Sequence, residues 1–232
     1  MISVIIPTFN EEEHIAATIK ILRQYDEQNL IKEIIIADGG STDNTVVIAK
    51  SQNVITVISQ KKGRAAQMNF GASNATSEIL YFLHADTIPP NNFTNDIVQS
   101  IQQGYGAGCF MLSFDHDHWF LKANCWFTRF DVNAIRFGDQ SLFVTKDNFN
   151  KVNGFKEDHI VLEDQQIIKQ LKKVTWFVII KKPVLTSARK YIENGIYKTQ
   201  LIFFIIYFMY HLGYSQQKLV TTYSKLIRQN KL

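Results

Sequence analysis

Acidic side chains occur, singly or in a pair, in polar segments that follow apolar runs of the chain. These acids are Asp38, Asp86 and the adjacent Glu163 and Asp164. Carboxylates at strand ends suit a divalent cation that bridges two phosphates, because hard cations prefer oxygen ligands. A further carboxylate away from the cation can serve as a general base. These residue types therefore predict a phosphate-containing substrate and a proton transfer.

Each acid also has a structural alternative. Asp38 precedes two glycines and could cap a turn. Asp86 could end its strand as a loop residue, and Glu163 and Asp164 could be first-turn acids that a helix dipole stabilises. The functional interpretation gains weight only if the fold brings these acids to one crevice.

Basic groups and one histidine lie in comparable segments. Lys61 to Arg64 precede an expected helix, whose backbone donors and cationic neighbours could bind a phosphate, although an exposed basic turn is an equal alternative. His84 could be a ligand or could lie under a nucleotide, and a structural histidine is the alternative. The sequence has no P-loop, no dinucleotide-binding glycine motif after its first strand and no nucleophile elbow.

The first half of the chain alternates between strand and helix patterns. Asn10, followed by three glutamates, is expected to be the N-cap of the first helix. The order predicts a doubly wound, mostly parallel α/β sheet with helices on both faces, in which ligands bind beyond the carboxyl ends of the strands. Apolar runs predict strands at 2–6, 34–37, 54–58 and 79–83, and helical spacing predicts helices over 45–50 and 65–75.

The second half is less regular. Strands are expected at 106–114, 141–145 and 176–180, and helices over 119–134 and 163–173. Residues 201–212 form an apolar run of twelve, which as a helix would be about 18 Å long and would not span the roughly 30 Å bilayer core. We expect one domain over 1–195 and a basic, apolar, helical C-terminal segment over 196–232.

Composition and charge limit the class of protein. Hydrophobic residues make up 46% and charged residues 20%, which indicates a globular chain. Two cysteines favour a reducing compartment, and the N-terminus lacks the basic region of a signal peptide. From Gln165 onward the chain carries 12 basic residues and one acid, Glu193, which predicts an anionic partner or a solvated basic face. Aromatic residues are not interleaved with these lysines as nucleic-acid binding by stacking requires, so no nucleic-acid partner is expected.

Six segments together resemble the family 2 glycosyltransferases of GT-A fold. The resemblance covers about residues 1–225 and is closer to a small bacterial branch with HADT, GDQ, ED and TSARR-like elements, which often carries an arsenosugar-biosynthesis label. In this chain the TSARR-like element is Thr186 to Lys190. The six segments are PTFNEEEHI, IIIADGGSTDNT, LHADTIPP, GDQSLFV, VNGF and LEDQQI.

The resemblance implies a role for each matching residue. Asp164 would be the general base, and Asp86 would hold Mn²⁺ or Mg²⁺ on the donor diphosphate. His84 stands at the first position of the D-x-D-type motif, where the family has a second carboxylate. The nucleotide-binding residues would be Pro7, Thr8, Glu11, Asp38, Arg64 and His84, and the acceptor pocket would contain Glu163, Gly138, Asp139, Gln140 and Arg189. Residues 1–116 would form the donor half and 117–195 the acceptor half.

The resemblance therefore implies a metal-assisted, inverting transfer of a sugar from a nucleotide-diphosphate sugar to an acceptor hydroxyl. The acceptor could be lipid-linked or a small molecule, in the cytoplasm or at the cytoplasmic face of an anionic membrane. One alternative is a nucleotide-sugar-binding or membrane-docking module without transfer activity. A sugar-nucleotide nucleotidyltransferase is less favoured, because the first strand is followed by Pro7 to Asn10 rather than by a glycine-rich basic loop.

Overall fold

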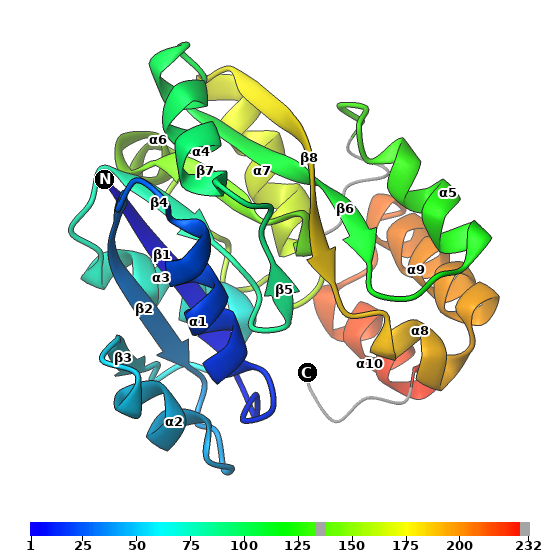
Figure 1. Ribbon diagram of the computed structural model, residues 1–232. Helices are drawn as coiled ribbons and strands as arrows, with labels where there is room; N and C mark the ends of the chain where they lie inside the picture. The colour runs from blue at the N-terminus through cyan, green and yellow to red at the C-terminus, as the bar shows by residue number, and fades with distance from the viewer. Residues whose placement is uncertain (133–137, 228–232) are drawn as a thin grey trace.

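The computed structural model describes residues 1–132 and 138–227 of the chain. Eight strands form one sheet in the order β3-β2-β1-β4-β7-β6-β8-β5 (Figure 1). The strands are β1 (Ile2–Thr8), β2 (Ile31–Asp38), β3 (Ile55–Ile58), β4 (Ile79–Phe82), β5 (Thr87–Ile88), β6 (Ala107–Phe114), β7 (Leu142–Thr145) and β8 (Phe177–Thr186).

The sheet is mixed, with a parallel amino-terminal part. β1 pairs in parallel with β2 and β4, β2 with β3, and β6 with β8. The strand β7 runs antiparallel between β4 and β6, and β5 runs antiparallel to β8. The predicted doubly wound, mostly parallel α/β class is confirmed, and strands from both predicted halves join one sheet.

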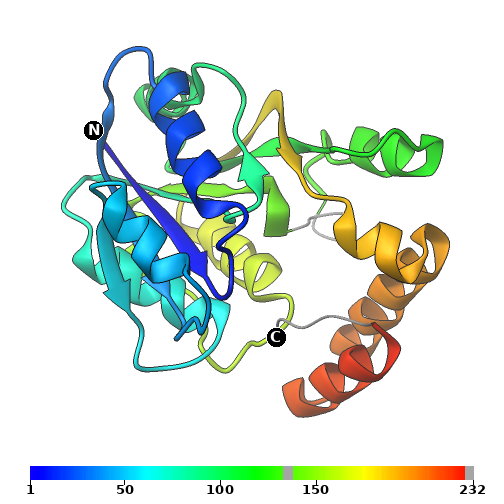
Figure 2. The same cartoon turned by 60° about the horizontal axis from the view of Figure 1, so that its bottom comes forward.

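Helices cover both faces of this sheet, as Figures 1 and 2 show. One apolar core lies under α1, α2 and α4, and a second core lies under α3, α6 and α7. These helices are α1 (Ile15–Tyr25), α2 (Thr45–Ser51), α3 (Arg64–Asn74), α4 (Phe93–Gln102), α6 (Lys146–Lys151) and α7 (Glu163–Val174).

Close packing of α3 on the parallel strands depends on a missing side chain. A Cβ on Gly71 would lie 2.5 Å from the Cγ2 atom of Ile5 in β1 and 3.3 Å from the Cβ atom of Ala37 in β2. The glycine therefore allows the helix to approach the sheet closely. This approach places the start of α3 beside the ends of β1 and β2.

The expected N-cap role of Asn10 is wrong. The helix α1 begins at Ile15, and Asn10 has a positive φ of 54°. Its side-chain oxygen accepts a hydrogen bond from the backbone N–H of Thr42 at 2.9 Å, while its own N–H donates to the Ser41 hydroxyl at 2.9 Å. Asn10 therefore connects the loop after β1 to the loop after β2, because it is engaged by that neighbouring loop and not by helical N–H groups.

One predicted helix of the second half has a different end, and one short helix is not predicted. The helix expected over 119–134 is α5 (Trp119–Phe127), and positions 133 and 134 lie outside the described residues. It ends where the Thr128 hydroxyl donates to the carbonyl of Cys125 and accepts the Leu112 N–H of β6. The segment that follows the strand β7 also contains the short helix α6, which the sequence pattern does not predict.

The C-terminal segment consists of three helices. They are α8 (Arg189–Asn194), α9 (Ile196–His211) and α10 (Gln216–Leu226). The apolar run at 201–212 overlaps the helix α9, which is longer than this run, with 16 residues. The helix begins directly after Gly195, which has a positive φ of 86°. None of the helices in residues 1–132 and 138–227 combines the length and apolar character needed to cross a membrane. The predicted division of the chain at position 195 stays a prediction.

Candidate active site

The ends of β1 and β2 meet at one edge of the sheet, with Thr8 directly opposite Asp38. The Asp38 carboxylate is fully buried. It accepts hydrogen bonds from the Thr8 hydroxyl at 3.0 Å, from the backbone N–H groups of Gly40 and Ser41 at 2.8 Å each, and from the Ser41 hydroxyl at 2.5 Å. Asp38 thus fixes the loop that follows β2.

Those four bonds occupy the lone-pair sites of a carboxylate. They match the turn-capping alternative for Asp38. A nucleotide base could bind this carboxylate only if it replaced one of these four hydrogen bonds. The base-binding role of Asp38 therefore stays a prediction. The parallel arrangement of β1, β2 and β4 does bring Asp38 to the same edge of the sheet as the segment that contains Asp86.

Gln67 is a residue of this edge that the sequence pattern did not indicate. From α3 its side-chain N–H₂ donates to the carbonyls of Thr8 at 2.6 Å and Ala37 at 3.1 Å, at the ends of β1 and β2. A Cβ on Gly39 would lie 2.7 Å from the same nitrogen. The sequence does show a glutamine on the buried side of a helix, one turn after Gly63. Its role is recognisable only when the fold shows which carbonyls lie next to it.

Arg64 is the first residue of α3 and lies against the two acids that open α7. Its guanidinium is hydrogen-bonded and ion-paired to Glu163, and its Nη2 atom lies 3.7 Å from Oδ2 of Asp164. The Glu163 side chain is fully buried, and its Oε2 atom has no hydrogen-bond partner among the described residues. The structure thus joins three predicted residues that are about a hundred positions apart in the chain.

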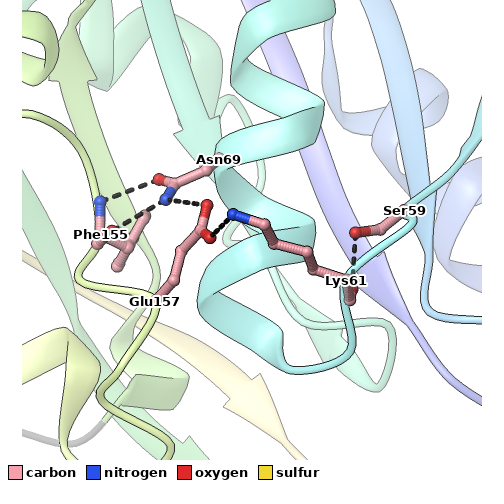
Figure 3. A network of polar contacts seen from close by, with 5 residues as sticks. All are labelled: Ser59, Lys61, Asn69, Phe155 and Glu157. Atoms are coloured by element: carbon pink, nitrogen blue, oxygen red, sulfur yellow. Dashed lines mark hydrogen bonds and ion pairs between the residues drawn. The ribbon is translucent and has the colours of Figure 1, made fainter.

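A polar network holds the segment before α7 against α3 (Figure 3). Asn69 of α3 donates to the carbonyl of Phe155 at 2.8 Å and accepts its N–H at 2.9 Å. Glu157 accepts hydrogen bonds from Asn69 at 3.3 Å and from the Lys61 ammonium at 2.6 Å, and the Ser59 hydroxyl donates to the Lys61 carbonyl at 2.7 Å. Lys61 therefore forms an exposed ion pair that links the loop before α3 to the segment before α7. The phosphate-binding alternative for residues 61–64 stays a prediction.

Asp164 has an unusual electrostatic environment. Burial, followed by the neighbouring charge of Glu163, raises the pKa of Asp164 from 3.8 to about 7, although Arg64 acts in the opposite direction. The residue Leu162, just before α7, adopts a left-handed backbone conformation with φ of 63°. Such strained positions outside glycine cluster at functional sites.

His84 and Asp86 follow β4 and complete the cluster. His84 Nδ1 lies 3.8 Å from Oδ1 of Asp139 in the 3₁₀ helix η2 (Gly138–Gln140). Burial, and then the positive charge of Arg64, lower the pKa of His84, so its ring is neutral near pH 7. The Asp86 carboxylate accepts no hydrogen bond from residues 1–132 or 138–227. The Ala85 carbonyl between them accepts a 2.6 Å hydrogen bond from Thr18 of α1, which fixes this loop.

The other predicted residues surround this cluster. Pro7 is buried within β1, and the Glu11 backbone N–H donates to the Thr45 hydroxyl at 2.7 Å. The Gln140 side chain is buried and donates to the Phe110 carbonyl at 2.9 Å, so it connects η2 with β6. Arg189 Nη1 lies 3.3 Å from Nε2 of His14, which joins the start of α8 to the start of α1.

The chain has the GT-A fold. Structures of S. aureus TarS and of the mannosyltransferase PcManGT from Pyrobaculum calidifontis, the latter with GDP-Man and Mn²⁺, each cover 97% of the chain with a TM-score of 0.68. The aligned regions make up 70% and 69% of those chains, at 13% and 16% sequence identity, which shows a shared fold alone.

Residues 3–155 match the family described as Glycosyl transferase family 2, and the chain belongs to this family. A Methanococcus voltae dolichyl N-acetyl-alpha-D-glucosaminyl phosphate 3-beta-D-2,3-diacetamido-2,3-dideoxy-beta-D-glucuronosyltransferase is 31% identical over 44% of this chain and 34% of its own length. Glycosyltransferase GlyG of Streptococcus pneumoniae is 32% identical over 44% of this chain and 36% of its own length. The chain thus matches about a third of the length of these relatives.

Proposed function

We propose that this chain is an inverting glycosyltransferase that moves a sugar from a nucleotide-diphosphate sugar to an acceptor hydroxyl, with Mn²⁺ or Mg²⁺ assisting. The observation that carries the proposal is the environment of Asp164, a largely buried carboxyl beside Arg64 whose pKa is raised to about 7. A group that exchanges its proton near neutral pH suits general-base catalysis. We also assign the chain to the small bacterial branch with HADT, GDQ and ED elements.

The donor would bind at the carboxyl ends of β1, β2 and β4. Structural neighbours with the same fold are complexes with UDP-GlcNAc, with GDP-Man and Mn²⁺, and with UDP and Mn²⁺. Pro7, Thr8, Glu11 and Asp38 shape the loops at this edge, and Arg64 and His84 lie next to it.

The residues of this site suit a divalent cation that the phosphates of the substrate help to hold. Among residues 1–132 and 138–227, no group of three His, Cys, Asp or Glu side chains forms a ready-made metal site. Asp86 nevertheless carries a carboxylate that accepts no hydrogen bond from the part of the chain that the structure describes. Magnesium is commonly held by one or two carboxylates together with substrate phosphates and water. Asp86 would hold the cation in this way, and a bound cation would neutralise charge on the leaving diphosphate.

The chain's own residues account for the proton transfer. Asp164 would accept the proton of the acceptor hydroxyl while that oxygen attacks the anomeric carbon. The nucleoside diphosphate leaves from the opposite face of the sugar, so the configuration inverts. Arg64 holds Glu163 and keeps a positive charge 3.7 Å from Asp164, which stabilises the carboxylate form of the base.

The acceptor would enter beside Asp164, where Glu163 and Asp139 contribute negative charge. Gly138 and Gln140 would position Asp139, and Arg189 would close the site against His14. We propose a hydroxyl acceptor, lipid-linked or small, and a cytoplasmic location for the reaction.

The test compares Asp164→Asn with the wild-type chain in sugar transfer and donor hydrolysis with Mn²⁺. We expect turnover to fall by about 10²–10⁴-fold, because that is the usual contribution of one general base, while UDP or GDP binds with unchanged affinity. Asp158→Asn is the matched control, since this side chain is exposed in the segment before α7. Full activity of Asp164→Asn would contradict the assigned base. Binding of nucleotide without any transfer by the wild type would favour the binding-module alternative, and release of pyrophosphate from a nucleoside triphosphate and a sugar phosphate would favour a nucleotidyltransferase.

A further inference from the structure

The outer side of α9 presents a continuous apolar surface. Leu201, Phe208 and Leu212 are 60%, 63% and 75% exposed. The exposed residues recur at spacings of three or four along the helix, so they lie on one side of it. This α9 stripe consists of Tyr197, Leu201, Phe204, Ile205, Phe208 and Leu212.

The helix α5 extends this surface. It lies beside α9 in Figure 1, and Asn124 of α5 donates a 3.1 Å hydrogen bond to Gln200 of α9. The Trp119 and Tyr197 rings lie 6.4 Å apart. Trp119 is 66% exposed, and Trp126, one further exposed aromatic residue, lies two turns later on the same helix. We call the α9 stripe together with Trp119 and Trp126 the aromatic face.

The charge of α9 and α10 is positive, and on the α5 side the exposed Asp117 is paired with Lys122 at 2.7 Å. The described residues of α9 and α10 include no aspartate or glutamate, and Lys198 and Lys218 are exposed on them. The Arg129 guanidinium lies 4.5 Å from the Trp126 ring centre. Exposed tryptophan, tyrosine and leucine next to lysine and arginine are typical of segments that lie in the interfacial region of an anionic bilayer.

We propose that the aromatic face binds the surface of an anionic lipid membrane, with α9 lying in the headgroup region. Charge complementarity decides between this occupant and a second copy of the chain. In a dimer formed through this face, the basic segments of the two copies would repel each other. Anionic lipid instead attracts each lysine near the membrane surface.

The inner side of α9 connects this surface to the candidate base. Ile202 and Ile206 belong to the same apolar cluster as Val161 and Leu162. Leu162 directly precedes Glu163 and Asp164, at the strained start of α7. A membrane bound by the outer side of α9 would therefore lie one helix away from the acceptor side of the site.

The experiment is co-sedimentation of the full chain with vesicles, without donor or metal. The wild type should bind vesicles of phosphatidylcholine with phosphatidylglycerol and should bind those of phosphatidylcholine alone weakly. Leu201→Glu with Phe208→Glu should lower the affinity about tenfold or more, because charged groups oppose insertion of the apolar side. Val47→Glu is the control, since Val47 is an exposed apolar residue on α2 at a distance from this face.

A second variant tests the proposal even if the first variant does not fold. Lys198→Gln with Lys218→Gln leaves the apolar side intact and should lower the affinity for anionic vesicles by about fivefold for each lysine. The proposal is wrong if the wild type fails to bind anionic vesicles or if both variants bind as the wild type does. It is also wrong if sedimentation shows a dimer that the glutamate variant dissociates while vesicles do not bind. Because these measurements need no sugar transfer, their failure is distinguishable from failure of the proposed reaction.

Discussion

The raised pKa of Asp164 predicts a specific dependence of stability on pH. In the folded chain, burial and then the Glu163 charge favour the neutral carboxyl up to about pH 7. In the unfolded chain the carboxyl ionises near its ordinary pKa of 3.8. The unfolded state therefore releases this proton first, and the wild type loses stability as the pH rises from about 4 to 7.

The magnitude follows from linkage. Each pH unit over which only the unfolded state is ionised changes the free energy of unfolding by about 1.4 kcal/mol. The interval between the two pKa values corresponds to a ceiling of about 4 kcal/mol, and we expect roughly 2–4 kcal/mol since the neighbouring charges titrate together with Asp164. For a chain of this size the difference corresponds to roughly 4–16 °C in melting temperature.

Asp164→Asn isolates this contribution, because asparagine keeps the shape of the neutral acid and cannot ionise. We expect thermal and urea unfolding to give similar stabilities for the variant and the wild type near pH 4–5, and a more stable variant at pH 8. Asp147→Asn on α6 is the control, since Asp147 is exposed and its curve should stay parallel to that of the wild type. A constant difference between Asp164→Asn and the wild type from pH 5 to pH 8 would refute a raised pKa.

Two further substitutions test the surroundings of this base. Glu163→Gln removes the charge that, after burial, most raises the pKa of Asp164, so the acid limb of kcat/KM against pH should move to lower pH. An unchanged limb would show that Glu163 does not act on the base electrostatically. Asp38→Ala removes the acceptor of four hydrogen bonds at the loop after β2. Urea unfolding should show a loss of roughly 2–4 kcal/mol, and a loss below half a kcal/mol would contradict the loop-fixing role.

Local sequence patterns located most elements of the first half correctly. The apolar run that begins at Ile2 is a buried parallel strand, and the helix expected over 65–75 is α3. These patterns succeed because the period of burial in a strand or helix is set by residues close in the chain. Asn10 was misassigned for the opposite reason, since its hydrogen-bond partners lie in another loop, at Ser41 and Thr42.

The candidate site was predictable as a set of residues but not as an arrangement. The resemblance named Arg64, Glu163 and Asp164 separately, and only the structure shows that Arg64 pairs with the two acids of α7. The nucleotide-binding role of Arg64 stays a prediction. Gln67 was missed because a glutamine in a helix has no distinctive pattern until the carbonyls of Thr8 and Ala37 lie next to it.

The sequence by itself therefore determined the family, the order of strands and helices, and the residue types that can carry out a group transfer. Those properties depend on local periodicity and on motifs that are contiguous in the chain. Only the tertiary structure decided that the Asp38 carboxylate is saturated by its own loop and that burial raises the pKa of Asp164. It also decided that α9 buries one apolar side on Leu162 and exposes the other. Burial and hydrogen-bond saturation depend on groups that are distant in the chain, and folding is what brings those groups together.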